Sequence, residues 1–299
     1  MTKIYAVTGS NKGIGYATVK GLSEKVPNAI IYLLARNTSL GETALANLKS
    51  ESNGKQISEV KFYQLDITKD ESCQRFAEYL KSTHGRLDVL INNAGIIADK
   101  SAPVDVQAVE TMDVNYYGTK RITNALLPII RPGGRIIVLC SLMGIMDGSG
   151  YHAKFNLGAY SETLRQKFNS TTFTEKDVDD FVAGFIRLAK EEVKTGEPKR
   201  KQGGYLESAY PVSKAADIAY MKSLARAVKD RNINVYGCCP GWVATDLNSH
   251  SGPFTTEEGA DTPIYLATDE NLPNGKFFSE RKVVEWPETK YDVNKVRMP

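Results

Sequence analysis

A glycine-rich loop near the start of the chain constrains its fold more than any other stretch of the sequence. The loop is Gly9-Ser10-Asn11-Lys12-Gly13-Ile14-Gly15, and it lies between a short apolar run at 4–7 and a helix-like segment at 16–25. Glycines let the backbone turn tightly and leave room for a diphosphate to approach. The free N–H groups at the start of the following helix then face the anion. An ordinary strand-to-helix turn has the same outline, but strand, glycine turn and helix in this order favour a phosphate-binding loop.

Strand-like apolar runs alternate with helix-like segments over most of the chain. Runs such as 29–34 are apolar without interruption, as expected of strands buried on both faces. The alternation implies βαβ units, so we predict an α/β fold with a doubly wound parallel sheet, the Rossmann fold. The polar tail beyond Trp286 is expected to be loose. The expected strands are 4–7, 29–34, 60–65, 87–91, 135–140, 233–238 and 276–278; the expected helices are 16–25, 39–49, 71–82, 108–130 (as one or two helices), 210–228 and 256–267.

The alternation breaks at residues 142–209, which are too many for a single loop. Thr174-x-x-Asp177 is a capping-box pattern, and it predicts a helix over 174–193. A second helix is expected at 161–168 and a solvated loop at 194–204. The segment is too small for a core of its own. We therefore predict one dinucleotide-binding and catalytic domain over 1–299, with a helical insertion at about 142–209 that packs its apolar stripe on that domain. The stripe consists of Val178, Phe181, Val182, Phe185, Ile186 and Leu188.

Composition excludes several classes of protein. Lys and Arg number 38 against 35 acids, and the net charge of +3 is too small to indicate a nucleic-acid surface. No apolar run approaches the roughly 20 residues that a membrane span needs. The first strand begins by Ile4, which leaves no room for a targeting peptide. The four cysteines are too few and too unevenly spaced for a disulfide framework or a zinc site, so we expect buried thiols, no metal and a cytoplasmic protein. They are Cys73, Cys140, Cys238 and Cys239.

The residues after the second expected strand indicate which nicotinamide cofactor the loop would take. An acid usually stands there, about 20 residues after the glycine loop, to hold the adenosine ribose diol. Here the position carries Ala35-Arg36-Asn37, and Lys12 adds a second positive charge inside the loop. Guanidinium binds a 2′-phosphate through charge-assisted bonds, whereas an acid would repel it. Most Arg and Lys side chains are simply solvated on the surface. Arg36 and Lys12, however, stand at the two positions where a 2′-phosphate would lie, with no acid competing. The pattern favours NADPH/NADP+.

Tyr210-x-x-x-Lys214 places a phenol and an ammonium on one face of a helix. A nearby ammonium favours phenolate and so lowers the tyrosine pKa, which suits the phenol to donate a proton to a carbonyl that receives hydride. The spacing alone is weak evidence, because three other pairs share it, and we expect these to be structural or solvated. They are Tyr16/Lys20, Tyr116/Lys120 and Tyr291/Lys295. Position selects Tyr210, since its helix precedes the strand that ends at Pro240-Gly241, and Pro211 suits a first helical turn.

Ser141 ends the fifth expected strand, at the edge where open α/β sheets bind ligands. Its hydroxyl can donate to a substrate carbonyl and support the oxyanion as hydride arrives. A serine in this place is otherwise most often a turn residue. The chain lacks a G-x-S-x-G elbow and its three histidines show no triad order, so serine hydrolysis is disfavoured. These histidines are His84, His152 and His250.

In their order along the chain, these motifs resemble those of the short-chain dehydrogenase/reductase family, over nearly the whole sequence. They comprise Thr8 to Gly15, Asp66, Asn92-Asn93-Ala94-Gly95, Asn115, Ser141, Tyr210 with Lys214, and Pro240-Gly241. The long insertion before the tyrosine is similar to that of the NADPH-dependent carbonyl reductases of this family. That similarity extends to Asn11-Lys12, Ala35-Arg36, Cys238 to Val243 and 262–267.

The resemblance implies a role for each residue. Tyr210 would protonate the carbonyl oxygen, Lys214 would lower its pKa and bind the nicotinamide ribose, and Ser141 would orient the carbonyl. Asn115 would hold a water that relays protons to Lys214, and Asp66 would lie beside the adenine, although alone it reads as a helix cap. The cofactor-binding set implied is Gly9, Asn11, Lys12, Gly13, Ile14, Gly15, Arg36, Asp66, Ile67, Asn93, Gly95, Tyr210, Lys214, Val243 and Thr245; the substrate set is Ser141, Met143, Tyr210 and Trp242, with core packing an equal reading for Met143.

Three functions stay open at this stage. The preferred one is an NADPH-dependent reductase of ketones, aldehydes or quinones. The others are a non-catalytic NADP(H)-binding sensor or scaffold, and an alcohol or steroid dehydrogenase that works oxidatively. The resemblance further suggests a monomer, because an insertion before the tyrosine helix should cover the face that related tetramers use. Neither the physiological substrate nor the stereochemistry follows from the sequence.

Overall fold

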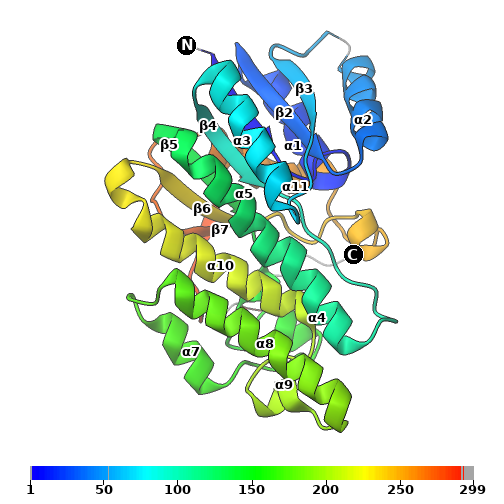
Figure 1. Cartoon of the computed structure of the whole chain (residues 1–299), viewed down its shortest axis with the longest axis vertical. Coiled ribbons are helices and arrows are strands. Elements are labelled where there is room, and N and C mark those ends of the chain that lie inside the picture. The colour runs from blue at the N-terminus through cyan, green and yellow to red at the C-terminus, as the bar shows by residue number, and fades with distance from the viewer. Residues whose placement is uncertain (1, 53, 291, 293–299) are drawn as a thin grey trace.

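One eight-stranded sheet forms the centre of the molecule, in the order β3-β2-β1-β4-β5-β6-β7-β8 (Figure 1). The computed structural model describes residues 2–52, 54–290 and 292. Every neighbouring pair of strands is parallel except β7 and β8, which are antiparallel. The strands are β1 (Lys3–Val7), β2 (Ala29–Ala35), β3 (Glu59–Gln64), β4 (Leu87–Asn92), β5 (Ile130–Leu139), β6 (Asn234–Cys239), β7 (Phe277–Ser279) and β8 (Lys282–Val284).

Helices cover both faces of this sheet, which confirms the predicted doubly wound α/β fold (Figure 1). Successive side chains of β2 alternate between two hydrophobic clusters: Ile31 and Leu33 pack on one side, Tyr32 and Leu34 on the other. A strand buried on both faces must be apolar at every position, and this explains the uninterrupted run. One face carries α1 (Gly13–Lys25), α2 (Thr38–Glu51) and α11 (Thr256–Thr268); the other carries α3 (Asp70–His84), α5 (Thr119–Leu126) and α10 (Ala209–Ala227).

The insertion lies at the end of the molecule drawn lowest in Figure 1 and consists of four helices. In the longest of these, α8, four residues of the predicted apolar stripe are buried in the same cluster as α4 and α10. The other two, Ile186 and Leu188, are half-buried against that cluster, so the packing of the stripe on the rest of the chain is confirmed. Both bonds of the predicted capping box between Thr174 and Asp177 are present. The helices are α6 (Tyr151–Lys154), α7 (Glu162–Asn169), α8 (Glu175–Thr195) and α9 (Lys199–Gln202).

The expectation of a solvated loop at 194–204 is wrong at Lys199–Gln202, which form the helix α9. The cause is Arg200, which is buried although it stands between two other basic residues, half-buried Lys199 and exposed Lys201. Its guanidinium Nη2 donates to Glu192 Oε1 at 2.8 Å, its Nη1 donates to the Glu207 carbonyl, and its Cζ lies 5.9 Å from the ring centre of Phe185. A buried cation needs such partners, and no periodicity in the sequence announces them.

The segment expected to form one or two helices at 108–130 contains two, which end at Leu126 and leave Ile130 to β5. Helix α4 (Val104–Met112) passes into a π-helical turn, η1 (Asp113–Gly118), and then into α5. A π turn adds a residue to the helical repeat and is found mostly at functional sites. The turn contains Asn115, whose side chain is fully buried.

The end of the chain departs from the expected loose tail as far as the structure describes it. Trp286 Nε1 donates to the Gly144 carbonyl at 2.7 Å, and Asp147 Oδ2 accepts from the N–H groups of Thr289 and Lys290 at 2.8 Å each. The segment therefore packs on the loop that follows Ser141. Residues 291 and 293–299 lie outside the described part. The sequence analysis also missed β8, a strand of only three residues.

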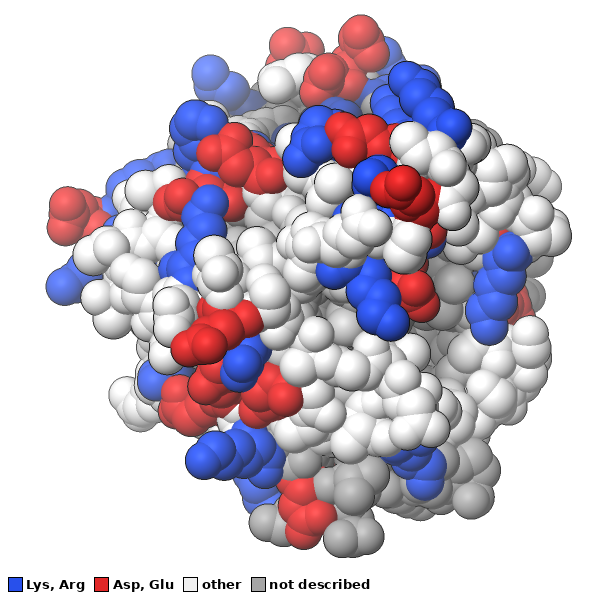
Figure 2. Space-filling view, turned by 90° about the horizontal axis from the view of Figure 1, so that it is seen from below, with Lys and Arg blue, Asp and Glu red and all other residues white. Residues whose placement is uncertain are grey.

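Charges of both signs are mixed on the face shown in Figure 2, which is seen from the insertion end. Lys and Arg side chains lie among Asp and Glu and around areas of uncharged residues (Figure 2). This pattern does not produce a field of one sign over that face. Among the described residues no helix combines the length and apolarity needed to cross a bilayer.

We expect Thr174→Ala to loosen the first turn of α8. The threonine hydroxyl accepts from the N–H of Asp177, and removing such a cap costs about 1 kcal/mol, or about five-fold in a local opening equilibrium. Amide hydrogen exchange at 175–180 should accelerate accordingly. The control is Thr43→Ala, an exposed mid-helix threonine of α2 whose hydroxyl donates to the Ser39 carbonyl. Equal exchange in wild type and Thr174→Ala would contradict the capping role.

Candidate functional site

The predicted site residues gather at the carboxyl edge of the sheet. Gly9 follows β1, Asn93 follows β4, Ser141 follows β5 and Gly241 follows β6. Because the carboxyl ends of parallel strands meet at one edge, segments far apart in the sequence converge there. The site is therefore assembled by the topology of the sheet.

The glycine loop has the backbone geometry that a bound phosphate group requires. Gly9 and Gly13 have φ of 61° and 59°, in the left-handed region that favours glycine. A Cβ on Gly15 would lie 2.7 Å from the Gly9 carbonyl oxygen and 2.4 Å from Asn93 Nδ2, so a side chain at 15 cannot fit. Helix α1 begins directly at Gly13, and Lys12 caps it without a side-chain hydrogen bond. Its first turn also carries no acid, so no carboxylate of that turn competes with an anion for the N–H groups and the positive dipole end of the helix.

Thr8, a motif residue to which the sequence analysis gave no role, ties this loop to the segment after β4. Its Oγ1 accepts from the N–H groups of Asn93 and Ala94 at 3.0 Å each. Asn93 Nδ2 in turn donates to the carbonyls of Thr8 and Gly9 at 2.8 and 3.0 Å. The two segments are thereby fixed relative to each other. Its place in the motif was the only feature of the sequence that could have indicated a role for Thr8, since a threonine after a strand is not distinctive by itself.

The two cations expected near a 2′-phosphate differ in their surroundings. Arg36 is exposed at the end of β2, and among the described residues its guanidinium has no hydrogen-bond or ion-pair partner. Lys12 Nζ lies 2.7 Å from Asp246 Oδ2, and this ammonium lowers the pKa of Asp246. The expectation that no acid competes is therefore wrong for Lys12. Asp246 follows the sixth strand, so its approach to the loop could not be read from local sequence.

Asp66 and Ile67 lie in the turn between β3 and α3. Asp66 Oδ1 accepts from the N–H and the hydroxyl of Thr68 at 2.9 and 2.7 Å. The N-cap of α3 is Lys69, so Asp66 is not the helix cap that the alternative reading proposed. Ile67 is buried, and its carbonyl accepts from Arg121 Nη1 at 2.7 Å.

Tyr210 and Ser141 meet although 68 residues separate them in sequence. Tyr210 lies in the first turn of α10, which begins at Ala209, with Pro211 buried beside it. Burial raises the pKa of the Tyr210 phenol, while the Lys214 ammonium and a hydrogen bond from Ser141 lower it. Ser141 Oγ also accepts from the N–H of Met143 at 3.1 Å, which fixes the serine side chain. The net shift is upward, so the phenol keeps its proton at neutral pH.

Lys214 is buried one turn further along α10. Its Nζ donates to the Leu139 carbonyl at 2.8 Å and to Asp217 Oδ2 at 2.9 Å, and it lies 5.8 Å from the ring centre of Tyr210. Burial tends to lower the pKa of Lys214, but Asp217 and Tyr210 raise it, and the net shift is upward. Lys214 is therefore an ammonium at neutral pH. Asp217 was not singled out from the sequence, and Lys214-x-x-Asp217 at helical spacing was its only signal.

Asn115 connects the π-helical turn to the segment after β4. Its Oδ1 accepts from the N–H of Ile96 at 2.8 Å, and its Nδ2 donates to the Ile96 carbonyl at 3.0 Å. The same Nδ2 donates to the hydroxyl of Ser213 at 2.9 Å. A Cβ on Gly95 would lie 3.4 Å from Asn115 Oδ1 and 3.8 Å from Lys214 Nζ. Asn115, Gly95 and Lys214 are thus neighbours, as their shared place in the predicted site requires.

The other tyrosine–lysine pairs lie away from this cluster. Tyr116 and Lys120 both contact Asp179 of α8, at 2.7 Å to its carboxylate in each case, so this pair attaches the insertion. Tyr16 and Lys20 lie on α1. The pair Tyr291/Lys295 falls outside the described residues.

Aromatic side chains form a wall near Ser141. Trp242, from the loop after β6, packs edge-on against Tyr151 and Phe155 of the insertion, with ring centres 6.4 and 5.8 Å apart. Met143 is partly buried against the main hydrophobic cluster, which supports the core-packing reading of this residue. No motif in the sequence singled out Tyr151 or Phe155.

The loop that carries Val243 and Thr245 lies against the glycine loop. A Cβ on Gly13 would be 3.5 Å from Thr245 Cγ2. Val243 is buried and forms an isolated β-bridge with Phe254. This arrangement places Thr245 next to the glycine loop.

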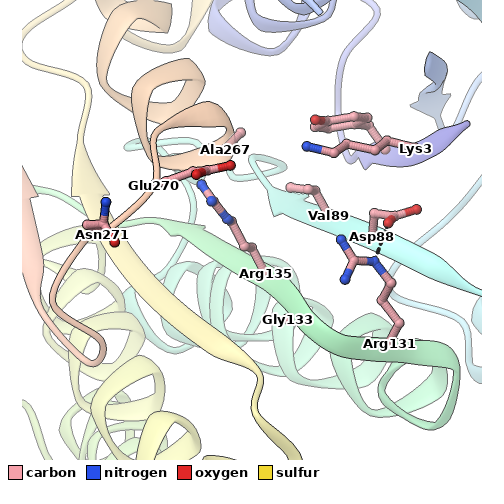
Figure 3. A pocket seen from close by; sticks show the side chains of 10 residues that line it. Lys3, Asp88, Val89, Arg131, Gly133, Arg135, Ala267, Glu270 and Asn271 are labelled. Carbon is pink, nitrogen blue, oxygen red and sulfur yellow. Dashed lines mark hydrogen bonds and ion pairs between the residues drawn. The ribbon is translucent and has the colours of Figure 1, made fainter. Parts of the chain in front are cut away.

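A separate cavity of about 210 Å³ lies at the opposite, amino-terminal edge of the sheet (Figure 3). Lys3, Asp88, Arg131 and Arg135 line it, and Arg131 is drawn toward Asp88, whose carboxylate it contacts. No predicted site residue lines this cavity. Within the described ranges no group of three or more His, Cys, Asp and Glu side chains could hold a metal ion.

Comparison with known sequences places these observations in a family. The sequence model of the short chain dehydrogenases matches residues 3–174 and 195–255. The gap between the matched segments corresponds to helix α8. Carbonyl reductase (NADPH) 3 of Rattus norvegicus is 35% identical over 294 residues, which cover 95% of this chain and 99% of that protein. Carbonyl reductase (NADPH) 1 of Homo sapiens is 35% identical over 290 residues, covering 94% and 97%.

Solved structures share the fold. Salutaridine reductase from Papaver somniferum superimposes with a TM-score of 0.79 at 26% identity, covering 93% of this chain and 99% of that one. Menthone neomenthol reductase from Mentha piperita gives a TM-score of 0.73 at 25% identity, covering 94% and 100%.

We expect Gly15→Ala to weaken binding of the dinucleotide cofactor by at least ten-fold, because the added methyl would collide with the Gly9 carbonyl and displace the loop. The matched control is Gly21→Ala on the same helix, whose methyl would meet only the end of the Ile264 side chain. Titration with NADPH, followed by protein fluorescence, measures both. Equal affinities for the two variants would contradict the loop's role.

Proposed function

Because the chain belongs to the short-chain dehydrogenase family, we propose that it is an NADPH-dependent reductase that converts ketones, aldehydes or quinones to alcohols. The observation that carries this proposal is the convergence of Ser141, Tyr210 and Lys214 beside the glycine loop. The names of the carbonyl reductases to which the chain is 35% identical support the same activity. One domain with a helical insertion would carry out the whole reaction.

The residues present fit the cofactor. A Cβ at position 15 would fill the space inside the glycine loop, so only glycine leaves that space open. The first turn of α1 offers uncapped N–H groups to a diphosphate. Arg36 would bind the 2′-phosphate, Asp66 and Ile67 the adenine, and Asn93 and Gly95 the middle of the cofactor. Val243 and Thr245 would contact the carboxamide end, and Lys214 the nicotinamide ribose. NADPH, when bound, supplies the hydride.

The chain's own residues would manage the proton and the developing charge. Tyr210 holds a proton at neutral pH and would donate it to the carbonyl oxygen, because the raised pKa keeps the phenol protonated. The Lys214 ammonium stabilises the phenolate that this transfer leaves. The Ser141 hydroxyl would donate to the same carbonyl oxygen as negative charge builds on it. Asn115 would hold the water that returns a proton through Lys214.

The aromatic wall suits a flat or apolar carbonyl compound. Trp242 and Met143 would contact the substrate, with Tyr151 and Phe155 behind Trp242. Apolar pockets with a few oriented polar groups are the usual form of small-molecule sites. Polar specificity then comes from Ser141 and Tyr210.

Two further properties belong to this proposal. Helix α8 packs on α4 and α10, which supports a monomer because it covers the face of the tyrosine helix. Four buried, unpaired thiols are in keeping with a reducing cytoplasm.

Two alternatives predict different measurements. A sensor or scaffold would bind NADPH without turning over any carbonyl compound in a broad panel. A dedicated alcohol or steroid dehydrogenase would prefer oxidation of its alcohol with NADP+. The intact Tyr210 and Lys214 pair argues against the first.

Tyr210→Phe should lower kcat for NADPH oxidation with aromatic ketones and quinones by about 10²- to 10⁴-fold, the usual contribution of a general acid. NADPH affinity should change little, since the ring remains. The control is Tyr16→Phe, which has the same spacing to a lysine on another helix and should stay within two-fold of wild type. Equal rates for wild type and Tyr210→Phe would refute the proposed mechanism.

Arg36→Ala should raise the dissociation constant for NADPH by about 10- to 100-fold, since a charge-assisted bond to phosphate is lost. Affinity for NADH, which lacks that phosphate, should stay nearly the same. Lys12→Ala should have a smaller effect, because Lys12 Nζ is paired with Asp246 Oδ2 at 2.7 Å and would have to leave that carboxylate to bind the phosphate. A parallel loss for both cofactors would show that Arg36 does not select the phosphate.

A further inference from the structure

A buried carboxylate lies three residues after the lysine of the site, on the same helix. Asp217 is 1% exposed, and its Oδ2 accepts from Lys214 Nζ at 2.9 Å. Its other oxygen, Oδ1, is buried and has no hydrogen-bond partner among the described residues. A buried carboxylate with an unsatisfied oxygen costs free energy, and burial raises the pKa of Asp217 to about 6. Helix packing alone would be served better by an apolar residue, so the charge at this position calls for a functional reason.

The position of this carboxylate fixes the ammonium. An ammonium has three N–H donors. Leu139 of β5 accepts from one and Asp217 of α10 accepts from another, on two separate elements. The flexible lysine stem is thereby held between strand and helix, with one donor left for the site. Without Asp217, the Leu139 carbonyl would be its single partner in the described structure.

Few other ionisable groups act on this pair. Tyr210 faces Lys214 from α10, Cys140 faces it from the residue after β5, and Cys238 and Cys239 lie on β6. Burial raises the pKa of all three thiols, so they are neutral at physiological pH. Among these neighbours Asp217 is therefore the group whose negative charge acts on Lys214 and Tyr210.

We propose that Asp217 is a positioning residue for the reaction, which holds the Lys214 ammonium against the Leu139 carbonyl and sets the charge that the Tyr210 phenol experiences. This inference rests on the proposed carbonyl reduction. A negative charge raises the pKa of every neighbouring acid, so removing it lowers the pKa of both Lys214 and Tyr210. Whichever of the two limits the reaction at high pH, the alkaline limb of the pH profile must then move to lower pH. Protonation of Asp217 below about pH 6 also removes its negative charge, so wild-type activity should decline there.

The test is Asp217→Asn, which keeps the size of the side chain and removes its charge. The control is Ser223→Ala, which removes a buried polar group of α10 whose hydroxyl donates to the Tyr220 carbonyl. NADPH oxidation with a panel of aromatic ketones and quinones is measured from pH 5 to 11 at saturating NADPH. We expect Asp217→Asn to lower kcat at least ten-fold while KM for the carbonyl compound stays within about two-fold. Its alkaline limb should move to lower pH, and the decline below about pH 6 should disappear.

Several results would overturn the proposal. If Asp217→Asn has a kcat like that of Ser223→Ala, or a lower kcat with an unmoved alkaline limb, Asp217 serves only in packing. If Asp217→Asn does not fold, Asp217→Glu decides, since it retains the charge on a longer stem. It should lower kcat while its alkaline limb stays near that of wild type, and an unchanged kcat would refute positioning. Absence of turnover in wild type would instead refute the proposed function.

Discussion

The ammonium of Lys214 occupies the point where three parts of the fold meet, and the rest of the site depends on its place there. Strand β5 supplies the Leu139 carbonyl, helix α10 supplies Tyr210 and Asp217, and the segment after β4 supplies Gly95. A cation buried in this way is stable only if its partners are arranged in advance. The sheet provides part of that arrangement, because β4 and β5 are paired in parallel register, and α10 packs against β5 and β6.

The surroundings of the site follow from this constraint. Close approach of α10 to the loop after β5 requires Gly144, where a Cβ would lie 2.6 Å from the Lys214 backbone. The C-terminal segment holds the same loop through Trp286 and Asp147. On its outer side α10 packs on α8, which Tyr116 and Lys120 attach through Asp179. The insertion, the tail and the helix thus support one another, although they are far apart in sequence.

The sequence predicted what local pattern encodes. Uninterrupted apolar runs gave the central strands, the capping box gave α8, and glycine spacing located the loop before α1. Contacts between distant segments escaped prediction: Asp246 beside Lys12, the buried Arg200 that forms α9, and the aromatic partners of Trp242. The π-helical turn at Asn115 was also missed, because the bonds of Asn115 to Ile96 and Ser213 join segments that are distant in sequence. Asp217 was not singled out, because its helical spacing from Lys214 does not reveal that its carboxylate is buried.

In the proposed mechanism Lys214 acts through Tyr210, and the direct test of this coupling is a double-mutant cycle on kcat at saturating NADPH. Lys214→Met is compared with its parent in two backgrounds, wild type and Tyr210→Phe, with one aromatic ketone as substrate. We predict that Lys214→Met lowers kcat about 100-fold in the wild-type background and less than about three-fold in the Tyr210→Phe background, which lacks the phenol. The same loss in both backgrounds would contradict the account.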